Sequence, residues 1–194
     1  DGWPDIYLTQ GCTWPPGSSS GQQRDQLYRN LGNGTFADVT KAAGLGDDLF
    51  SQGATVGDLN NDGFPDLYVA NIGRNRLYLN CGDGTFEDIS NQLSNASKRW
   101  TTSCLIADLN GDGFADIYDV NYLTGNTIFQ EVCDGQICHP NEFNPEQDQL
   151  FLNNGQAGFL NATETAGITS KHGNGLGIVA ADFSGGKTLD VFVA

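Results

Sequence analysis

The stretch Asp58-Leu-Asn-Asn-Asp-Gly-Phe-Pro-Asp66 decides the fold, because it recurs fifty residues later as Asp108-Leu-Asn-Gly-Asp-Gly-Phe-Ala-Asp116. A decayed copy occupies residues 182–190 (DFSGGKTLD), and residues 1–5 (DGWPD) match the end of a further copy. The closing aspartates, at positions 5, 66, 116 and 190, are 61, 50 and 74 residues apart. A period of this length is typical of proteins that are built from repeated structural units.

A second element repeats in phase with the first. Residues 27–40 (LYRNLGNGTFADVT) match residues 77–90 (LYLNCGDGTFEDIS) closely and residues 150–163 (LFLNNGQAGFLNAT) more loosely. Each copy reads as a strand, a turn built on Asn, Asp and Gly, and a second strand rich in Thr, Phe and Val. The element therefore predicts a β-hairpin in each repeat.

Together the two elements predict about four short strands in each period. In the second period we expect these strands at residues 54–57, 66–70, 76–79 and 85–89. Four strands every ~50 residues without helical periodicity indicate a β-propeller blade, with a β-sandwich or a solenoid as the alternatives. The longer periods contain insertions, which we place at residues 11–26 and 123–148.

We therefore expect an all-β fold in which residues 1–194 form about three four-stranded blades. Propellers close with about four to eight blades, and open blades leave unpaired strand edges. The expectation is an incomplete propeller of the seven-bladed type, which is completed by the rest of a longer protein or by a partner chain.

The aspartate loops have the donor pattern of a calcium site. Calcium takes about six to eight oxygen ligands from carboxylates, amides and backbone carbonyls, and a glycine at position 6 permits the sharp turn. We expect side-chain ligands at positions 1, 3, 5 and 9 and a carbonyl ligand at position 7. These residues are Asp58, Asn60, Asp62, Phe64 and Asp66 in one loop and Asp108, Asn110, Asp112, Phe114 and Asp116 in the other.

An EF-hand, an ordinary turn and a magnesium site fit these loops less well. An EF-hand needs a bidentate Glu at position 12 and helices on both sides, but position 12 is Val69 or Asp119 and the flanks are strand-like. Asp and Asn residues also cap ordinary turns, although three carboxylates within nine residues repel each other without a cation. Magnesium prefers a rigid octahedron with several retained waters, so calcium is the expected ion.

The outer copies of the loop are incomplete. The copy at residues 182–190 has Gly186 where the third carboxylate would stand, so an occupied and an empty site are both open. The copy at the start of the sequence contains only the second half of the motif. The candidate ligands in these copies are Asp182, Ser184 and Asp190, and Asp1 and Asp5.

The charge of the chain excludes some classes of partner. The sequence contains 24 acidic and 9 basic residues, with a formal net charge of −15. This charge argues against a nucleic-acid-binding or anionic-membrane surface. No apolar run approaches the ~18–20 residues of a membrane span. Of the acidic residues 19 are Asp and 5 are Glu, which indicates turns and loops because Asp favours them.

Five cysteines leave at least one without an intramolecular partner. We expect a disulfide between Cys133 and Cys138, which would constrain the long insertion. A zinc site that includes His139 is the alternative, with few soft ligands to support it. Cys104 lies in an apolar run and is expected to be a buried thiol, whereas the states of Cys12 and Cys81 stay open.

The loops and the strands that follow them resemble FG-GAP/VCBS repeats, which form calcium-bearing propellers. The added LYxNxGxGTFxDVT element is similar to the cartilage acidic protein family and its bacterial relatives. The resemblance covers nearly the whole chain. It implies a propeller fold, calcium sites and a secreted, periplasmic or cell-surface location, but it does not imply a reaction.

Two functions are compatible with the sequence. The first is a calcium-stabilised scaffold for adhesion or for recognition of a protein or glycan. Its binding surface would be the insertions, where such surfaces tend to evolve, with Trp14, Tyr122 and Phe143 as aromatic candidates. The second is a propeller enzyme that acts on polysaccharide as a lyase or hydrolase. The well-placed carboxylates already belong to the loops and we assign no catalytic residue, so the scaffold is the preferred interpretation.

Overall fold

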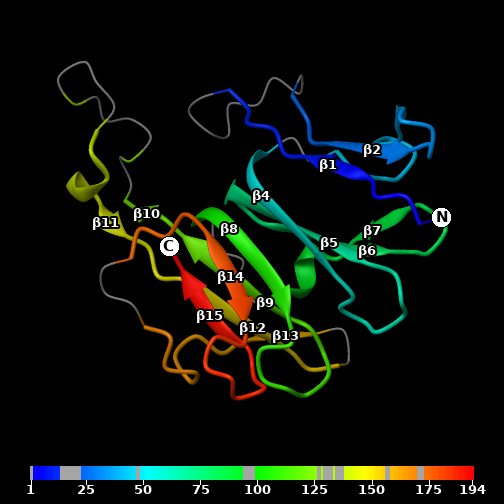
Figure 1. Ribbon diagram of the computed structural model, residues 1–194. Helices are drawn as coiled ribbons and strands as arrows, with labels where there is room; N and C mark the ends of the chain where they lie inside the picture. Colours follow the sequence, from blue (N-terminus) through cyan, green and yellow to red (C-terminus); the bar gives the residue numbers. More distant parts are fainter. Residues whose placement is uncertain are drawn as a thin grey trace.

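The computed structural model describes residues 2–13, 23–46, 49–93, 99–125, 128, 133, 138–155, 158–169 and 173–194. Within them the chain forms antiparallel β-sheets arranged as successive propeller blades, together with two short 3-10 helices (Figure 1). The predicted all-β fold is confirmed. The EF-hand alternative is excluded, because strands flank both full aspartate loops.

The second and third blades each contain four antiparallel strands. The second blade consists of β4 (Phe50–Gly57), β5 (Asp66–Gly73), β6 (Arg76–Asn80) and β7 (Phe86–Asp88). The third consists of β8 (Arg99–Ala107), β9 (Asp116–Asn121), β12 (Gln149–Asn153) and β13 (Phe159–Asn161). All four strands predicted for the second period are present, and β4 and β5 extend several residues beyond the predicted ends.

The flanking blades are represented by fewer strands in the described residues. The first contains β1 (Ile6–Leu8), β2 (Gln26–Asn30) and β3 (Phe36–Asp38). The fourth contains β14 (Ile178–Ala181) and β15 (Asp190–Val193). Because β2 begins at Gln26, the first insertion ends one residue earlier than predicted. In the second insertion β10 (Leu123–Thr124) pairs with β11 (Asn144–Pro145), a ribbon that the sequence did not predict.

Two 3-10 helices complete the described secondary structure. η1 (Ser90–Gln92) follows β7, and η2 (Pro140–Glu142) lies in the second insertion. The first strands of adjacent blades lie close together, with β8 in contact with both β4 and β14. Figure 1 shows β8 between β4 and β14.

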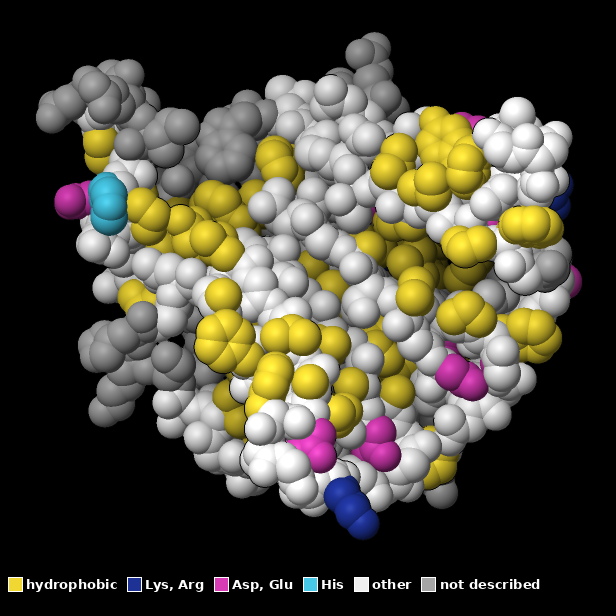
Figure 2. Space-filling model, viewed as in Figure 1, with side chains coloured by type: hydrophobic (Ala, Val, Ile, Leu, Met, Phe, Trp, Pro, Cys, Tyr) yellow, Lys and Arg dark blue, Asp and Glu magenta, His cyan; other side chains and the backbone are white. Residues whose placement is uncertain are grey.

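Each seam between adjacent blades has its own hydrophobic core. Figure 2 shows that apolar side chains also gather on the face turned to the viewer. The first seam packs Leu67, Val69 and Tyr78 against Tyr7 and Leu45 of the first blade. The second seam buries residues from both complete blades, including Tyr68, Leu77, Ile106, Ile117 and Phe151. The third seam packs Tyr118, Val120 and Leu150 against Ile178 and Val193 of the fourth blade. Alternate residues of β5 and β9 thus face opposite seams, as the period of two in a strand requires.

Candidate functional site: the aspartate loops

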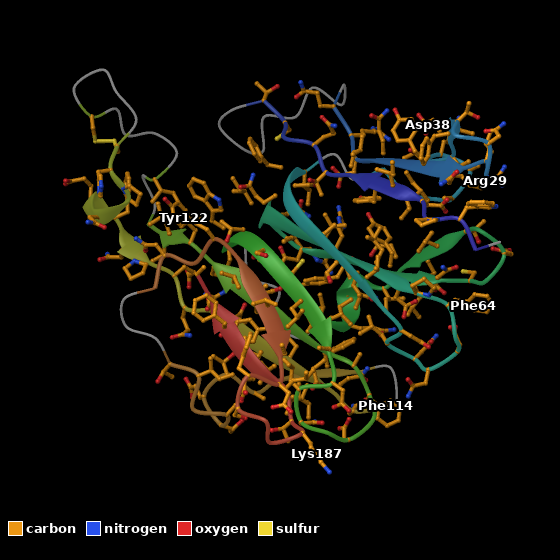
Figure 3. All side chains as sticks on the ribbon, in the orientation of Figure 1. Arg29, Asp38, Phe64, Phe114, Tyr122 and Lys187 are labelled. Carbon is orange, nitrogen blue, oxygen red and sulfur yellow. A yellow bond between two sulfur atoms is a disulfide. The ribbon has the colours of Figure 1, made fainter. Side chains whose placement is uncertain are left out.

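The aspartate loops connect the first and second strands of each blade. Residues 58–66 run from β4 into β5, residues 108–116 from β8 into β9, and residues 182–190 from β14 into β15. Figure 3 shows Phe64 on the first of these loops, Phe114 on the second and Lys187 on the third. Corresponding positions of the repeat therefore occupy corresponding positions in each blade.

In the loop at residues 58–66 the acidic side chains are bonded to the loop backbone. The Asp58 carboxylate accepts hydrogen bonds from the backbone N–H groups of Asp62 (3.1 Å) and Gly63 (2.8 Å). The Asp62 carboxylate accepts one from Phe64 N–H (2.8 Å) and one from the side-chain amide of Asn60 (2.9 Å). Asp58, Asn60 and Asp62 are therefore drawn around one tight turn at the surface.

The loop at residues 108–116 repeats this arrangement almost atom for atom. The Asp108 carboxylate accepts hydrogen bonds from Gly111 N–H (2.7 Å) and Gly113 N–H (2.9 Å). The Asn110 side-chain amide donates to Asp112 (2.9 Å), which also accepts from Phe114 N–H (2.9 Å). Two independent stretches of sequence therefore produce one geometry.

The last aspartate of each full loop is fully buried and connects the loop to the third strand of its blade. Asp66 accepts hydrogen bonds from Leu59 N–H (2.8 Å) and Asn80 N–H (2.8 Å). Asp116 accepts the equivalent bonds from Leu109 (2.9 Å) and Asn153 (2.9 Å). The sequence suggested a ligand at this position but not this role.

Charge repulsion is visible at both buried aspartates. Burial raises the pKa of Asp66, the backbone hydrogen bonds partly offset it, and the nearby charges of Asp62 and Asp58 raise it further. The pKa of Asp116 is raised by the same causes, with the charges of Asp112 and Asp108. The three carboxylates of each loop are therefore close enough to repel one another, as their spacing in the sequence predicts.

The aromatic residue at position 7 packs over a turn glycine in the same blade. A Cβ atom built on Gly82 would lie 2.7 Å from the Phe64 ring, and one on Gly155 would lie 2.7 Å from Phe114. Trp3 occupies the same place over Gly32 in the first blade. The side chains at position 7 thus pack against the hairpin turns. The candidate calcium ligand at this position is the backbone carbonyl.

The two full loops also contact each other. The side-chain amide of Asn61 donates to the Gly113 carbonyl (3.0 Å), and Asn61 has a positive φ of 60° that turns it toward the next blade. The buried amide of Asn153 donates to both the Leu59 carbonyl (2.8 Å) and the Ala115 carbonyl (3.1 Å). One side chain therefore bridges the loops of adjacent blades.

The incomplete copies keep part of the geometry. Asp182 accepts hydrogen bonds from Gly186 N–H (2.9 Å) and Lys187 N–H (2.9 Å), while Asp190 accepts one from Ser184 N–H (2.9 Å). Asp5 accepts a hydrogen bond from Asn30 N–H (2.8 Å). Asp1 lies outside the described residues.

The donor chemistry of the full loops fits calcium. Each loop presents one half-buried carboxylate, one exposed carboxylate and one amide, with a third carboxylate fully buried, and all the side-chain donors are oxygens of the kind that calcium prefers. In the part of the chain that the structure describes, however, no three His, Cys, Asp or Glu side chains are already gathered as a metal site. Instead, the carboxylates that would hold the ion accept hydrogen bonds from their own loop backbone.

The cysteines and the aromatic residues of the insertions were also singled out by the sequence. Cys133 and Cys138 form a disulfide with a Cα–Cα distance of 5.0 Å, as predicted. Cys104 is a buried free thiol, also as predicted, Cys81 is exposed and Cys12 is half-buried. Tyr122 packs edge-on against Trp100, with ring centroids 5.2 Å apart, and Phe143 is half-buried. Trp14 lies outside the described residues.

The blades, the phased loops and the linking hairpins define a repeat protein of the propeller class. The family model described as FG-GAP-like repeat matches residues 1–69 and 58–118, and the chain belongs to this family. No curated protein matches the sequence significantly. None of the described helices has the length and apolarity that a membrane span requires.

Proposed function

We propose that this chain is a calcium-stabilised, extracytoplasmic propeller scaffold for adhesion or for recognition of a protein or glycan ligand. The observation that carries the proposal is the arrangement of each full loop, where two carboxylates and one amide surround a tight turn and a third carboxylate is buried close enough for their charges to raise its pKa. A divalent cation among these oxygens would remove the repulsion between the carboxylates. In the loop at residues 58–66 the ion would be held by Asp58, Asn60, Asp62, the Phe64 carbonyl and Asp66.

The remaining parts of the proposal rest on the insertion and on the repeat elements. Disulfides persist mainly in oxidising compartments, so the Cys133–Cys138 bridge supports a secreted, periplasmic or cell-surface location. The described β10–β11 ribbon and η2 of the second insertion extend away from the third blade (Figure 1), and such connecting segments commonly form binding surfaces. The LYxN hairpin element supports a closer relation to the cartilage acidic protein family and its bacterial relatives, and a complete propeller of seven blades.

Thermal unfolding with and without calcium tests the structural role of the ion. At free calcium of about 100 times the dissociation constant, each occupied site adds roughly 2.7 kcal/mol of stability. For a chain of this size that corresponds to a rise in Tm of about 5–10 °C per site. EDTA should lower the Tm, and calcium should restore it better than magnesium does.

Variants locate the effect in the loops. Asp62→Asn and Asp112→Asn each replace one exposed carboxylate ligand by a neutral amide, and each should weaken calcium binding measured by titration calorimetry. Glu87→Gln removes one exposed carboxylate from β7, outside the loops, and serves as the control. An unchanged Tm after complete chelation, or equal calcium binding by the loop variants and the control, would contradict the proposal.

The recognition role needs a separate measurement. Glycan arrays and pull-downs with extracellular matrix components should give a ligand whose binding is reduced by Phe143→Ala in the second insertion. Leu160→Ala, an exposed apolar position on β13, is the matched control. Binding that is lost equally in both variants would place the ligand surface elsewhere.

A further inference from the structure

The three seams between blades share one hydrogen-bonded unit. A tyrosine two residues after each loop's last aspartate faces an Asp or Asn that precedes the third strand of its blade. In the first seam Asp25 accepts hydrogen bonds from Tyr7 Oη (2.9 Å), Gln10 N–H (2.7 Å) and Ser51 Oγ of the next blade (2.8 Å). In the third seam Asp148 accepts from Tyr118 Oη (3.3 Å) and Asn121 N–H (2.8 Å).

In the second seam the carboxylate comes from the later of the two blades, whereas in the other two seams it comes from the earlier blade. Here the position of Asp25 and Asp148 is occupied by Asn75, which is neutral. The next blade contributes Asp119, three residues after the last aspartate of its loop, where the first and third seams have Val69 and Val193. Each seam thus contains one carboxylate at this pair of positions, and only the second seam carries it on the later blade.

The Asp119 carboxylate of the second seam is buried in a network of hydrogen bonds. Asp119 is 3% exposed, and its Oδ2 atom accepts hydrogen bonds from Tyr68 Oη (3.0 Å) and Asn75 Nδ2 (2.8 Å). The Asn75 amide also donates to Thr101 Oγ1 (3.1 Å) across the seam. In contrast to the backbone-bonded Asp25 and Asp148, Asp119 has no backbone N–H donor among the hydrogen bonds of the described residues.

The second oxygen of this carboxyl group has no hydrogen-bond donor in the described part of the chain, and Asp119 borders a small cavity. Asp119 Oδ1 accepts no hydrogen bond from any described residue. Asp119 lines a cavity of about 10 Å³, which is close to the space that one water molecule needs. The polar side chains around this cavity are Tyr68, Asn75, Arg99, Thr101, Asp119 and Gln149.

The charges around Asp119 act on its pKa in opposite directions. On β8, Arg99 faces the site but is ion-paired with Glu146. The other titratable groups that act on Asp119 are Tyr68 on β5, Cys104 on β8 and Asp148 before β12, and Asp148 carries the same sign of charge. Burial raises the pKa of Asp119 to about 7, against the lowering effects of the Tyr68 and Asn75 hydrogen bonds and of Arg99.

We propose that Asp119, Tyr68 and Asn75 form a buried proton-binding site that, with one water molecule in the adjacent cavity, makes the seam between the second and third blades sensitive to pH. In the neutral form the proton on Oδ1 donates to the water. On ionisation the proton passes to solvent and a negative charge stays in the seam. The ionised form is the less stable one, because burial penalises the charge more than its two hydrogen bonds compensate.

The sign of the effect follows from the two protonation equilibria. The unfolded chain releases this proton near pH ~3.9 and the folded chain near pH 7, so the contribution of Asp119 to folding stability falls as the pH rises between these values. Well above pH 7 the folded chain has also released this proton, and the contribution of Asp119 to stability no longer changes with pH.

The test compares the wild type with Asp119→Asn, which keeps the shape and removes the charge, at pH 5 and pH 8 and at fixed calcium concentration. The Tm difference between the two proteins should change by roughly 5–10 °C between these pH values, in favour of the variant at pH 8. Glu87→Gln, an exposed substitution, should show no such change. An equal Tm difference at both pH values would overturn the proposal.

An exchange experiment and a titration give independent readouts. Asn75→Asp alone places two carboxylates in one buried site and should lower the Tm at pH 8, whereas adding Asp119→Val recreates the pattern of the other seams and should restore most of it. A double variant no more stable than Asn75→Asp would refute the inference that the two positions supply the same carboxylate.

The carbon-13 chemical shift of the Asp119 carboxyl should titrate near pH 7, and titration near pH ~3.9 would refute the proton site.

Discussion

The bridge between the two full aspartate loops can be tested through Asn153. This residue ends β12 and is 4% exposed, and its amide donates to carbonyls in both loops, those of Leu59 and Ala115. Its side-chain oxygen also accepts a hydrogen bond from Gly155 N–H (3.0 Å). Asn153→Ala removes all three hydrogen bonds but retains the backbone bond to Asp116.

The expected cost follows from the groups left without partners. A buried carbonyl or N–H that loses its partner costs about 1–3 kcal/mol. Here the bond to Leu59 is buried, and the bonds to Ala115 and Gly155 are partly buried. We therefore expect Asn153→Ala to lower the free energy of unfolding by roughly 3–5 kcal/mol. Against a typical total of about 5–15 kcal/mol, this is a large effect for one side chain.

The second blade provides a matched control. Asn80 occupies the same repeat position, but its amide donates only to Pro65 in its own blade (3.0 Å), and this bond is exposed. Asn80→Ala should cost about 1 kcal/mol, because water replaces the lost partners. The free energy of unfolding of both variants is measured by urea titration, with tryptophan fluorescence as the signal. An unchanged m-value is the check on two-state behaviour. Equal costs, within about 0.5 kcal/mol, would refute the argument that Asn153 couples the loops.

Two further predictions concern packing and thiol chemistry. Gly57→Ala should destabilise the protein by about 1–3 kcal/mol, because the new Cβ would lie 2.3 Å from Cγ2 of Ile106. Gly177→Ala, where the Cβ meets open space, should not, and similar melting of both variants would contradict the packing argument. Maleimide should label exposed Cys81 in the native protein but Cys104 only after unfolding, since burial raises the pKa of the Cys104 thiol well above its usual value. Native labelling of Cys104 would disprove its burial.

The features that could be predicted from the sequence are those that repeat locally. The loops at residues 58–66 and 108–116 and the hairpins after them appear where the motif spacing placed them, because turn chemistry and strand alternation act over a few residues. The blade seams could not be predicted in the same way. The partnership of Asn75 with Asp119 depends on two residues that are 44 positions apart and that the fold brings within 2.8 Å. Aligning the repeats shows that both positions depart from the pattern, but only the structure shows that the departures meet.

The structure also explains why the two sequence motifs stay in phase although the insertions differ in length. In each of the first three blades the last aspartate of the loop accepts a hydrogen bond from the asparagine of the hairpin element, at Asn30, Asn80 and Asn153. The aromatic residue of the same loop covers the glycine two positions after that asparagine. An insertion between the second and third strands leaves both contacts intact, because it leaves the blade at one end of these strands and the contacts lie at the other. The loop and the hairpin are therefore one structural unit, and the length of the chain between them is free to vary.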